Sequence, residues 1–265
     1  MATGNDVSYP QYGSSLPSAP AFGIVGVNGG LANNLNPCFG TWASYPNYSQ
    51  SELYCALASA TGSTSQPKAL PYVNTGDPGN VYSGSPIADW PTSGSTPYGA
   101  CVTTTVVLSS GSYTVGENSD PCAWQYGYDR ACQDVTWLAE AASALNAQQS
   151  ALPVSGSASS YPWWLDVETG NSWQSDTTMN VADLQGMVAA LRDAGATTVG
   201  AHSTTSQWGT ITGGSQARSL GWLPDWIPGA RTLSGAESNC LQASFTGSKV
   251  TLTQWASHPD GDYSC

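Results

Sequence analysis

Two acidic side chains stand two residues apart in the most aromatic stretch of the chain. The segment 161–173 reads YPWWLDVETGNSW, and its apolar run leads directly into Asp166 and Glu168. In an extended strand, residues two apart point to the same face, so both carboxylates should project together. Carboxylates in apolar surroundings are unfavourable unless they are paired or hydrogen-bonded. The pair predicts either acid/base or nucleophilic work by two carboxyl groups, or a strand end with one capping and one solvated acid.

The composition favours a globular protein with a weakly charged surface. Of 265 residues, 40% are hydrophobic, which is enough to fill the core of one large α/β barrel or two modest domains. Because 18 acids face only 6 Lys and Arg, the net charge of −12 should repel phosphate backbones and anionic membranes. We therefore expect no nucleic-acid partner.

The aromatic residues suit a carbohydrate ligand. Eleven Trp and thirteen Tyr stand against three Phe, and Trp and Tyr combine a flat apolar face with a hydrogen-bonding edge. The alternative is that most of these rings simply fill the core. We expect a polysaccharide or oligosaccharide partner and a monomeric protein.

Seven cysteines indicate disulfides and an oxidising compartment. None forms a C-x-x-C motif, and no repeated Cys/His spacing suggests zinc. A Cys240–Cys265 bond would hold the end of the chain, and a Cys101–Cys122 bond would close a loop. The sequence does not allocate the other three, which are Cys38, Cys55 and Cys132.

The first residues, MATGNDVSYP, have neither a charged nor an apolar region typical of a signal peptide. We interpret Met1 as the start of a mature, exported domain. No stretch approaches the roughly 20 apolar residues of a membrane span. The expected location is therefore extracellular, without a membrane span.

Strand and helix patterns alternate along the chain. Helical spacing is clearest over 129–149, and again from Asn180, as an N-cap, to Gly195. Shorter helices are expected within 36–60 and 206–211. A long Gly, Ser, Thr and Pro-rich excursion over 80–121, with a possible hairpin at 101–108 and 112–115, reads as an insertion. Strands are predicted at 3–8, 21–28, 69–74, 162–168, 197–203, 223–227 and 249–255.

This alternation predicts an α/β fold, a parallel (β/α) TIM-like barrel whose site lies at the carboxyl ends of the strands. We expect one disulfide-bonded domain over residues 1–265, with the 80–121 insertion inside it. A doubly wound open sheet is the alternative, but no glycine fingerprint follows the first strand.

Several polar and aromatic side chains are candidates for substrate binding. Asn28, Asn74 and Asp77 follow strand ends, where they could contact sugar hydroxyls or serve turns. The aromatic cluster that includes Trp124, Gln125 and Tyr126 could line a groove or merely cover a helix start.

The two histidines limit other chemistries. His202 is either a pocket-facing residue or a hydrogen-bonded core histidine, and no nucleophile elbow surrounds Ser203. His258 with Asp260 and Asp262 is a pattern of low specificity for metal binding. We predict no metal and no cofactor.

Six segments, taken together, resemble a known family. DVSYPQYG, FGIVGVNGG, WWLDVE, VGAHST, LTQW and DGDYSC follow the order of the landmark strands of glycoside hydrolase family 25-like lysozymes. The resemblance spans nearly the whole chain, and its most specific element is the D-x-E of WWLDVE combined with the terminal segments. It implies a secreted bacterial glycosidase with a (β/α) barrel whose second half has short helices.

The resemblance also implies roles for particular residues. Glu168 would be the general acid, Asp166 its carboxylate partner and Asp6 a further acid. Asp262 is preferred to Asp260 as the acid near the C-terminus. Gln254 and Trp255, on the closing strand, become further candidates for substrate binding.

Two departures from the family fall where substrate would lie. The second and third strands end in VNGG and VNTGDPG, and the 80–121 insertion is foreign to compact members. Scaffold and acids can therefore be shared while the polysaccharide differs. Peptidoglycan is the first expectation, and the alternatives are another glycan, a sugar-binding barrel without activity, or a structural domain.

Overall fold

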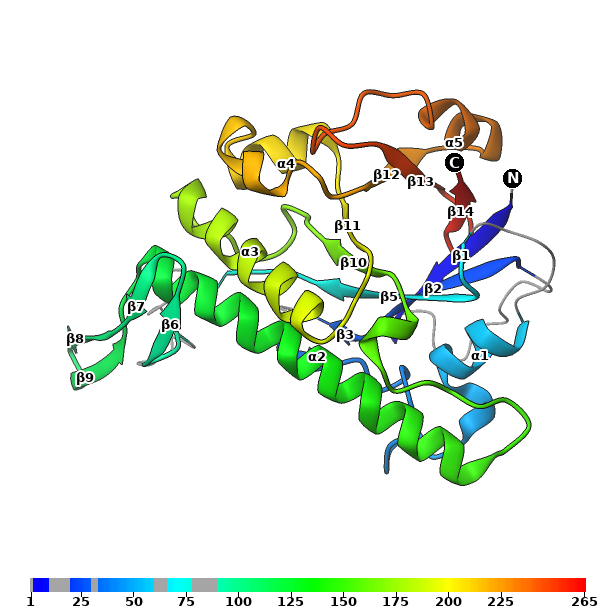
Figure 1. Ribbon diagram of the computed structural model, residues 1–265, viewed down its shortest axis with the longest axis horizontal. Coiled ribbons are helices and arrows are strands. Elements are labelled where there is room, and N and C mark those ends of the chain that lie inside the picture. The colour runs from blue at the N-terminus through cyan, green and yellow to red at the C-terminus, as the bar shows by residue number, and fades with distance from the viewer. Residues whose placement is uncertain (1, 10–19, 30–32, 60–65, 78–89) are drawn as a thin grey trace.

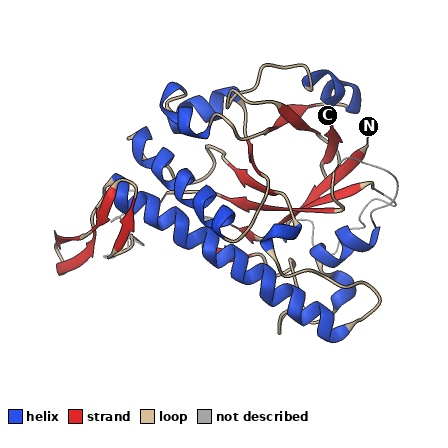
Figure 2. Cartoon of the chain, in the orientation of Figure 1, coloured by secondary structure: helices blue, strands red, loops and turns tan. Residues whose placement is uncertain are grey.

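The computed structural model describes residues 2–9, 20–29, 33–59, 66–77 and 90–265. Eight of its strands form a closed barrel in the order β1-β14-β13-β12-β11-β10-β5-β2 (Figures 1 and 2). These strands are β1 (Thr3–Val7), β2 (Phe22–Gly26), β5 (Ala69–Asn74), β10 (Trp163–Asp166), β11 (Val199–His202), β12 (Asp225–Ala230), β13 (Val250–Trp255) and β14 (Gly261–Ser264).

The α/β barrel is confirmed, but its strands are not all parallel. β14 pairs antiparallel with both β1 and β13, whereas the other neighbours in the barrel are parallel. Only five residues separate Trp255 from Gly261, too few for the crossover that a parallel strand needs. The segment interpreted as a tail is therefore the strand that closes the barrel.

Large apolar side chains fill the inside of the barrel. The rings of Trp164 and Trp226 meet edge to face with centroids 6.0 Å apart, and Tyr72 lies 6.1 Å from Trp226. Leu165 and Val167 point outward into the core beneath the helices, so the predicted alternation along β10 is confirmed. The other buried residues of the interior cluster are Ala2, Phe22, Ile24, Leu70 and Leu252.

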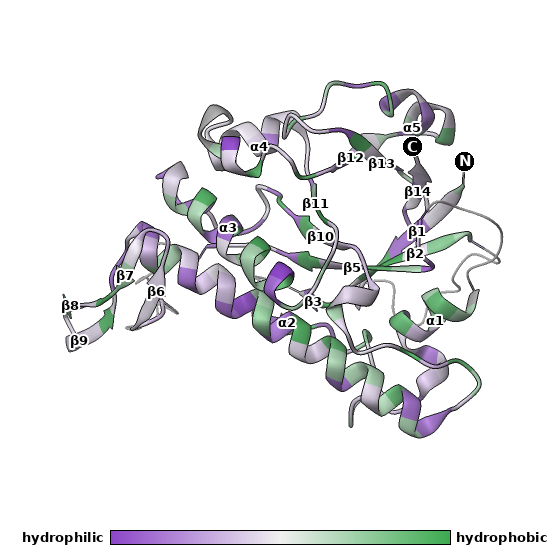
Figure 3. Cartoon of the chain, in the orientation of Figure 1, coloured by the Kyte–Doolittle hydropathy of each residue, from purple (hydrophilic) through white to green (hydrophobic). Residues whose placement is uncertain are grey.

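Helices cover the outside of the barrel, and the two longest cross closely. Hydrophilic and hydrophobic residues alternate along α2, as expected of a helix with one apolar side (Figure 3). A Cβ atom on Gly127 of α2 would lie 2.0 Å from a backbone oxygen of α3, and one on Gly186 of α3 would lie 1.9 Å from one of α2. The helices are α1 (Glu52–Ser59), α2 (Asp120–Gln148), α3 (Thr177–Asp193), α4 (Thr205–Thr212) and α5 (Leu233–Asn239), with 3-10 turns η2 (Tyr48–Gln50), η3 (Ala158–Ser160) and η4 (Ser215–Leu220).

Both long helices begin earlier than predicted. α2 begins at Asp120, nine residues before the predicted start, because Pro121 fits a first helical turn and the aromatic cluster continues the helix. α3 begins at Thr177 behind the N-cap Asp176, whereas Asn180 is buried inside the helix. The predicted end is confirmed, since Gly195 follows α3 with a φ of +94°.

The insertion forms two hairpins at the amino-terminal end of α2 (Figure 1). The second hairpin confirms the predicted one, while residues 80–89 lie outside the described ranges. The short strands are β3 (Asn28–Gly29) and β4 (Asn34–Leu35), then β6 (Gly94–Thr96), β7 (Gly99–Cys101), β8 (Thr103–Leu108) and β9 (Gly111–Gly116).

Both predicted disulfides are present. Cys101–Cys122 joins β7 to α2, and Cys240–Cys265 joins the end of α5 to the residue after β14. The three remaining cysteines form no disulfide within the described ranges: Cys38, Cys55 and Cys132. Within the described ranges, no helix is long and apolar enough to cross a membrane.

Fully buried acids lie between the long helices and the barrel. Burial raises the pKa of Asp183 well above its usual value, the charge of Asp77 adds to this, and Arg130 opposes it. Burial likewise raises the pKa of Asp134, again against Arg130. These carboxyl groups favour the protonated form, because one guanidinium cannot neutralise three acids.

The interior packing predicts an effect of filling Gly200. A Cβ atom there would lie 2.4 Å from the ring of Trp164, so Gly200→Ala should lower the free energy of unfolding by about 1–3 kcal/mol in a denaturant titration. Gly209 of α4 has nothing within 4 Å of its Cβ position, so Gly209→Ala should stabilise by about 0.4–1 kcal/mol. Equal stability of the Gly200→Ala variant and the parent would contradict this packing.

The buried acids predict a pH dependence of stability. Asp183 binds its proton more tightly in the folded protein than in the unfolded chain. The stability that this bound proton contributes is therefore lost as pH rises above about 4. The stability of Asp183→Asn relative to the parent should therefore increase between pH 4 and pH 7. Glu140→Gln, at an exposed site of α2, is the matched control and should track the parent. A constant difference at every pH would exclude this explanation.

Candidate active site

The two acids of the central strand lie at the carboxyl edge of the barrel. Asp166 is the last residue of β10, in register with Asn74 of β5 and His202 of β11. Glu168 follows the strand, and its backbone oxygen accepts a hydrogen bond of 2.8 Å from the Trp173 indole. Trp164 and Asp166 share the inner face of the strand, so the sequence correctly placed this acid inside.

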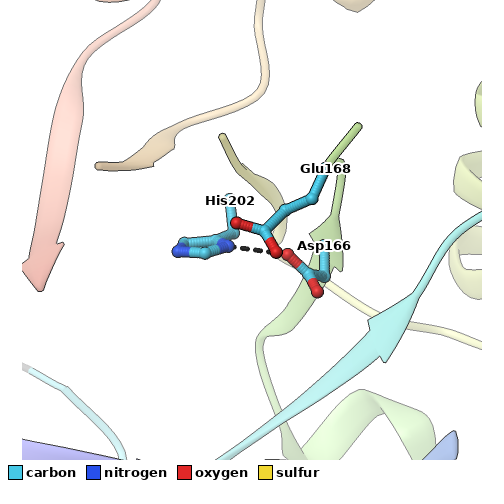
Figure 4. Close-up of side chains that lie close together, drawn as sticks. All are labelled: Asp166, Glu168 and His202. Atoms are coloured by element: carbon cyan, nitrogen blue, oxygen red, sulfur yellow. Dashed lines mark hydrogen bonds and ion pairs between the residues drawn. The ribbon is translucent and has the colours of Figure 1, made fainter. Parts of the chain in front are cut away.

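Asp166 is joined to His202 (Figure 4). The Nδ1 atom of His202 lies 2.7 Å from Oδ1 of Asp166, which is a hydrogen-bond length. The imidazole is only 6% exposed, and its ring centroid lies 4.1 Å from that of Trp226. Its Nε2 atom is buried without a hydrogen-bond partner. The ring therefore has one fixed polar contact and one packed face.

This geometry shifts the pKa values of two groups. Burial raises the pKa of Glu168, and the charge of Asp166 raises it further, while His202 and Gln207 act in the opposite direction. Burial alone would lower the pKa of His202, but the hydrogen bond and charge of Asp166, together with Glu168 and Asp6, place it above its usual value. The pKa values of Glu168 and His202 are thus both raised on either side of the Asp166 carboxyl group.

A second pair of acids lies across the barrel mouth. Asp262 of β14 is completely buried, and burial followed by the charge of Asp6 raises its pKa well above the usual value. Burial raises the pKa of Asp6 to about 6, although its Oδ2 accepts a hydrogen bond of 2.9 Å from Nε2 of Gln254. Of the two acids considered near the C-terminus, Asp262 is the one aligned with Gln254.

Asp166, Glu168 and His202 each offer one ligand atom, and these atoms lie within 4.8 Å of one another. A proton or a small cation could be shared at this spacing. One of these contacts is the 2.7 Å hydrogen bond between His202 and Asp166, and the pKa of Glu168 beside it is raised. The arrangement therefore brings together groups that can bind and exchange protons.

Predicted contacts at the ends of the second and third strands serve the backbone. Oδ1 of Asn28 accepts a 2.6 Å hydrogen bond from the backbone N–H of Asn74, and each side-chain amide donates to the other residue's backbone oxygen at 3.2 Å. Asp77 is fully buried and accepts a hydrogen bond of 3.0 Å from Gln174. These contacts join segments distant in the sequence and are not turns, and a role in sugar binding stays a prediction.

The aromatic candidates mainly hold the insertion against α2. Tyr126 is buried, with its ring 6.1 Å from that of Trp90, while Trp124 stacks on Tyr128. Gln125 lies against Gly94 of β6. These contacts match the alternative that the cluster covers a helix.

Trp255 packs on the outer side of β13. It belongs to the small cluster around α5, whereas its neighbour Gln254 hydrogen-bonds Asp6. The two consecutive residues of a strand thus face opposite sides. The predicted contact of Trp255 with substrate does not follow from this position.

Sequence reasoning missed three residues around the site. Trp226 packs on the His202 ring. Burial, followed by the charges of Asp6 and Asp166, raises the pKa of the Tyr72 phenol. Both occupy inward positions of strands, a signal that alternation could have supplied. Gln207 of α4, whose Oε1 accepts a 2.7 Å hydrogen bond from the Thr169 N–H, had no such signal.

Comparison with known proteins gives one family match. Residues 141–224 match the family model described as Lysozyme-like protein 1, a region that includes Asp166, Glu168 and His202. No curated protein sequence matches the chain.

Two solved structures are similar over nearly their whole length. The muramidase from Trichobolus zukalii is 13% identical with a TM-score of 0.48, and the similarity covers 100% of this chain and 94% of that one. The bacterial lysozyme from Streptomyces coelicolor is also 13% identical with a TM-score of 0.48, covering 99% and 91%.

The contact between Gln254 and Asp6 predicts a change in titration. Its hydrogen bond favours the ionised form of Asp6, so Gln254→Leu should raise the Asp6 pKa above about 6, by about one unit. Carbon NMR of the side-chain carboxyl group would measure the shift. Gln242→Leu, at an exposed site, is the control, and an unchanged Asp6 titration in Gln254→Leu would contradict the contact.

Proposed function

We propose that this protein is a glycosidase that uses Glu168 as its general acid and Asp166 as the carboxylate partner. The observation that carries the proposal is the pair itself. Glu168 has a raised pKa beside an Asp166 that is hydrogen-bonded to His202, at the carboxyl edge of a closed barrel. Glycosidic bond cleavage needs one protonated and one ionised carboxyl group in such proximity.

In this mechanism, Glu168 donates its proton to the glycosidic oxygen as the bond to the leaving sugar breaks. The carboxylate of Asp166 faces the positive charge that develops on the sugar ring and stabilises it. Their nearest ligand atoms lie within 4.8 Å, closer than the roughly 6.5–9.5 Å between the carboxyl groups of an inverting pair. This spacing favours charge stabilisation or direct attack by Asp166 over activation of a water between the two groups.

Asp6 and Asp262 would support the same chemistry from the opposite side of the mouth. The Asp6 pKa of about 6 means that its charge changes in the range where many hydrolases work. Asp262, fully buried next to it, favours the protonated form. Asp166, and Asp6 above its pKa of about 6, would then supply the negative charge suited to a cationic transition state.

We propose a cell-wall or extracellular polysaccharide as substrate, with peptidoglycan first. The lysozyme-like match over residues 141–224 supports a glycan substrate, and it contains both acids of the central strand. The two disulfides support an extracellular location, because such bonds persist in oxidising compartments.

The proposal predicts the effect of removing the acid. Glu168→Gln should lower kcat on peptidoglycan about 10²–10⁴-fold, since the amide keeps the shape but cannot donate the proton. Turnover should be measured by release of reducing ends on a panel of cell-wall and storage polysaccharides. Asp166→Asn should also lower kcat strongly, while Glu140→Gln, on the exposed side of α2, serves as the control.

Two outcomes would decide against the proposal. Hydrolysis that is unaffected by Glu168→Gln would remove the acid from its role. Binding of glycan by the parent without any product would instead favour a barrel that only binds sugar.

A further inference from the structure

The imidazole of His202 lies where the two acid pairs meet. Its Nδ1 contacts Asp166 at 2.7 Å, its ring packs at 4.1 Å on Trp226, and its Nε2 is buried without a hydrogen-bond partner in the described part of the chain. His202 is only 6% exposed, so the hydrogen bond with Asp166 is a contact that solvent barely reaches. The contact with Asp166 therefore determines its state.

We propose that His202 is a positioning residue that stays protonated and keeps Asp166 ionised, so that the transferable proton of the site resides on Glu168. This inference rests on the proposed function, because it explains which of two neighbouring carboxyl groups acts as the acid. It assigns His202 no contact with the substrate.

Within the described ranges, the titratable groups that act on the ring are carboxyl groups. Asp166 and Glu168 face it from the end of β10, and Asp6 faces it from β1. Asp262 of β14 lies behind Asp6, and the neutral phenol of Tyr72 on β5 lies near Asp6 and Asp166. A cation is the stable state of a ring in such surroundings, despite its burial.

The spacing of Asp166, Glu168 and His202 then determines which carboxyl group holds the proton. Two like charges as close as Asp166 and Glu168 cannot both persist without compensation. The imidazolium compensates the carboxylate that it hydrogen-bonds, which is Asp166. Glu168 consequently retains the proton.

The substitution His202→Gln separates charge from shape. The amide can still donate a hydrogen bond to Asp166, but without the positive charge both carboxyl groups hold protons to higher pH. Both limbs of the pH profile of kcat should therefore move upward by about one unit, with a loss in kcat at neutral pH that exceeds any change in KM. His258→Gln, at the exposed second histidine, should leave the profile unchanged.

A measurement that needs no turnover tests the charge itself. The chain has only two histidines, so nitrogen NMR of the His258→Gln protein reports His202 alone. Its ring should keep both protons to a pH above the ordinary histidine value of about 6.5. In Asp166→Asn, which also serves if His202→Gln does not fold, the ring should lose its charge at lower pH.

The outcomes separate this inference from the proposed function. A neutral His202 at pH 6, or a uniform loss of rate in His202→Gln with unmoved limbs, would overturn the positioning role while Glu168→Gln still tests the acid. Conversely, full activity of Glu168→Gln would remove the proposed function, and the NMR titration would still show whether His202 holds Asp166 ionised.

Discussion

The hydrogen bond between Asp166 and His202 is the contact on which the rest of the site depends. It requires the parallel register that pairs these two residues at the ends of β10 and β11. That register in turn depends on a barrel interior tightly filled by Trp164, against which Gly200 leaves room on the next strand. Core packing two residues below the mouth thus fixes the distance between a carboxylate and an imidazole.

The protein buries acids in two places, and the surroundings give them different properties. At the mouth, charges and hydrogen bonds from several strands distinguish one carboxyl group from the next, as for Glu168 beside the Asp166–His202 pair. Between α2 and the barrel, Asp134 is completely buried, and burial raises its pKa so that it favours its neutral form. The first arrangement suits proton transfer. The second lowers the free energy of unfolding as pH rises.

Local sequence patterns predicted the features that depend on local geometry. The two-residue period of β10 placed Asp166 and Leu165 on opposite faces, and the positions of the cysteines suggested both disulfides. The Asp166–His202 contact and the Trp226 cover could not be predicted, because they depend on register between strands distant in sequence. β14 was missed because four residues after a Pro and Gly-rich segment carry too weak a strand pattern.

The direction of β14 also determines how the protein can be attached to a surface. Because this strand runs against its neighbours, its carboxyl end lies at the same barrel edge as the beginning of β1, where Thr3 pairs with Tyr263. Asp166 lies at the opposite edge. A linker fused to either of these chain positions would leave the carboxylate mouth facing away from the support. Immobilised protein would therefore keep that mouth accessible to a large polymer that cannot diffuse between the protein and the support.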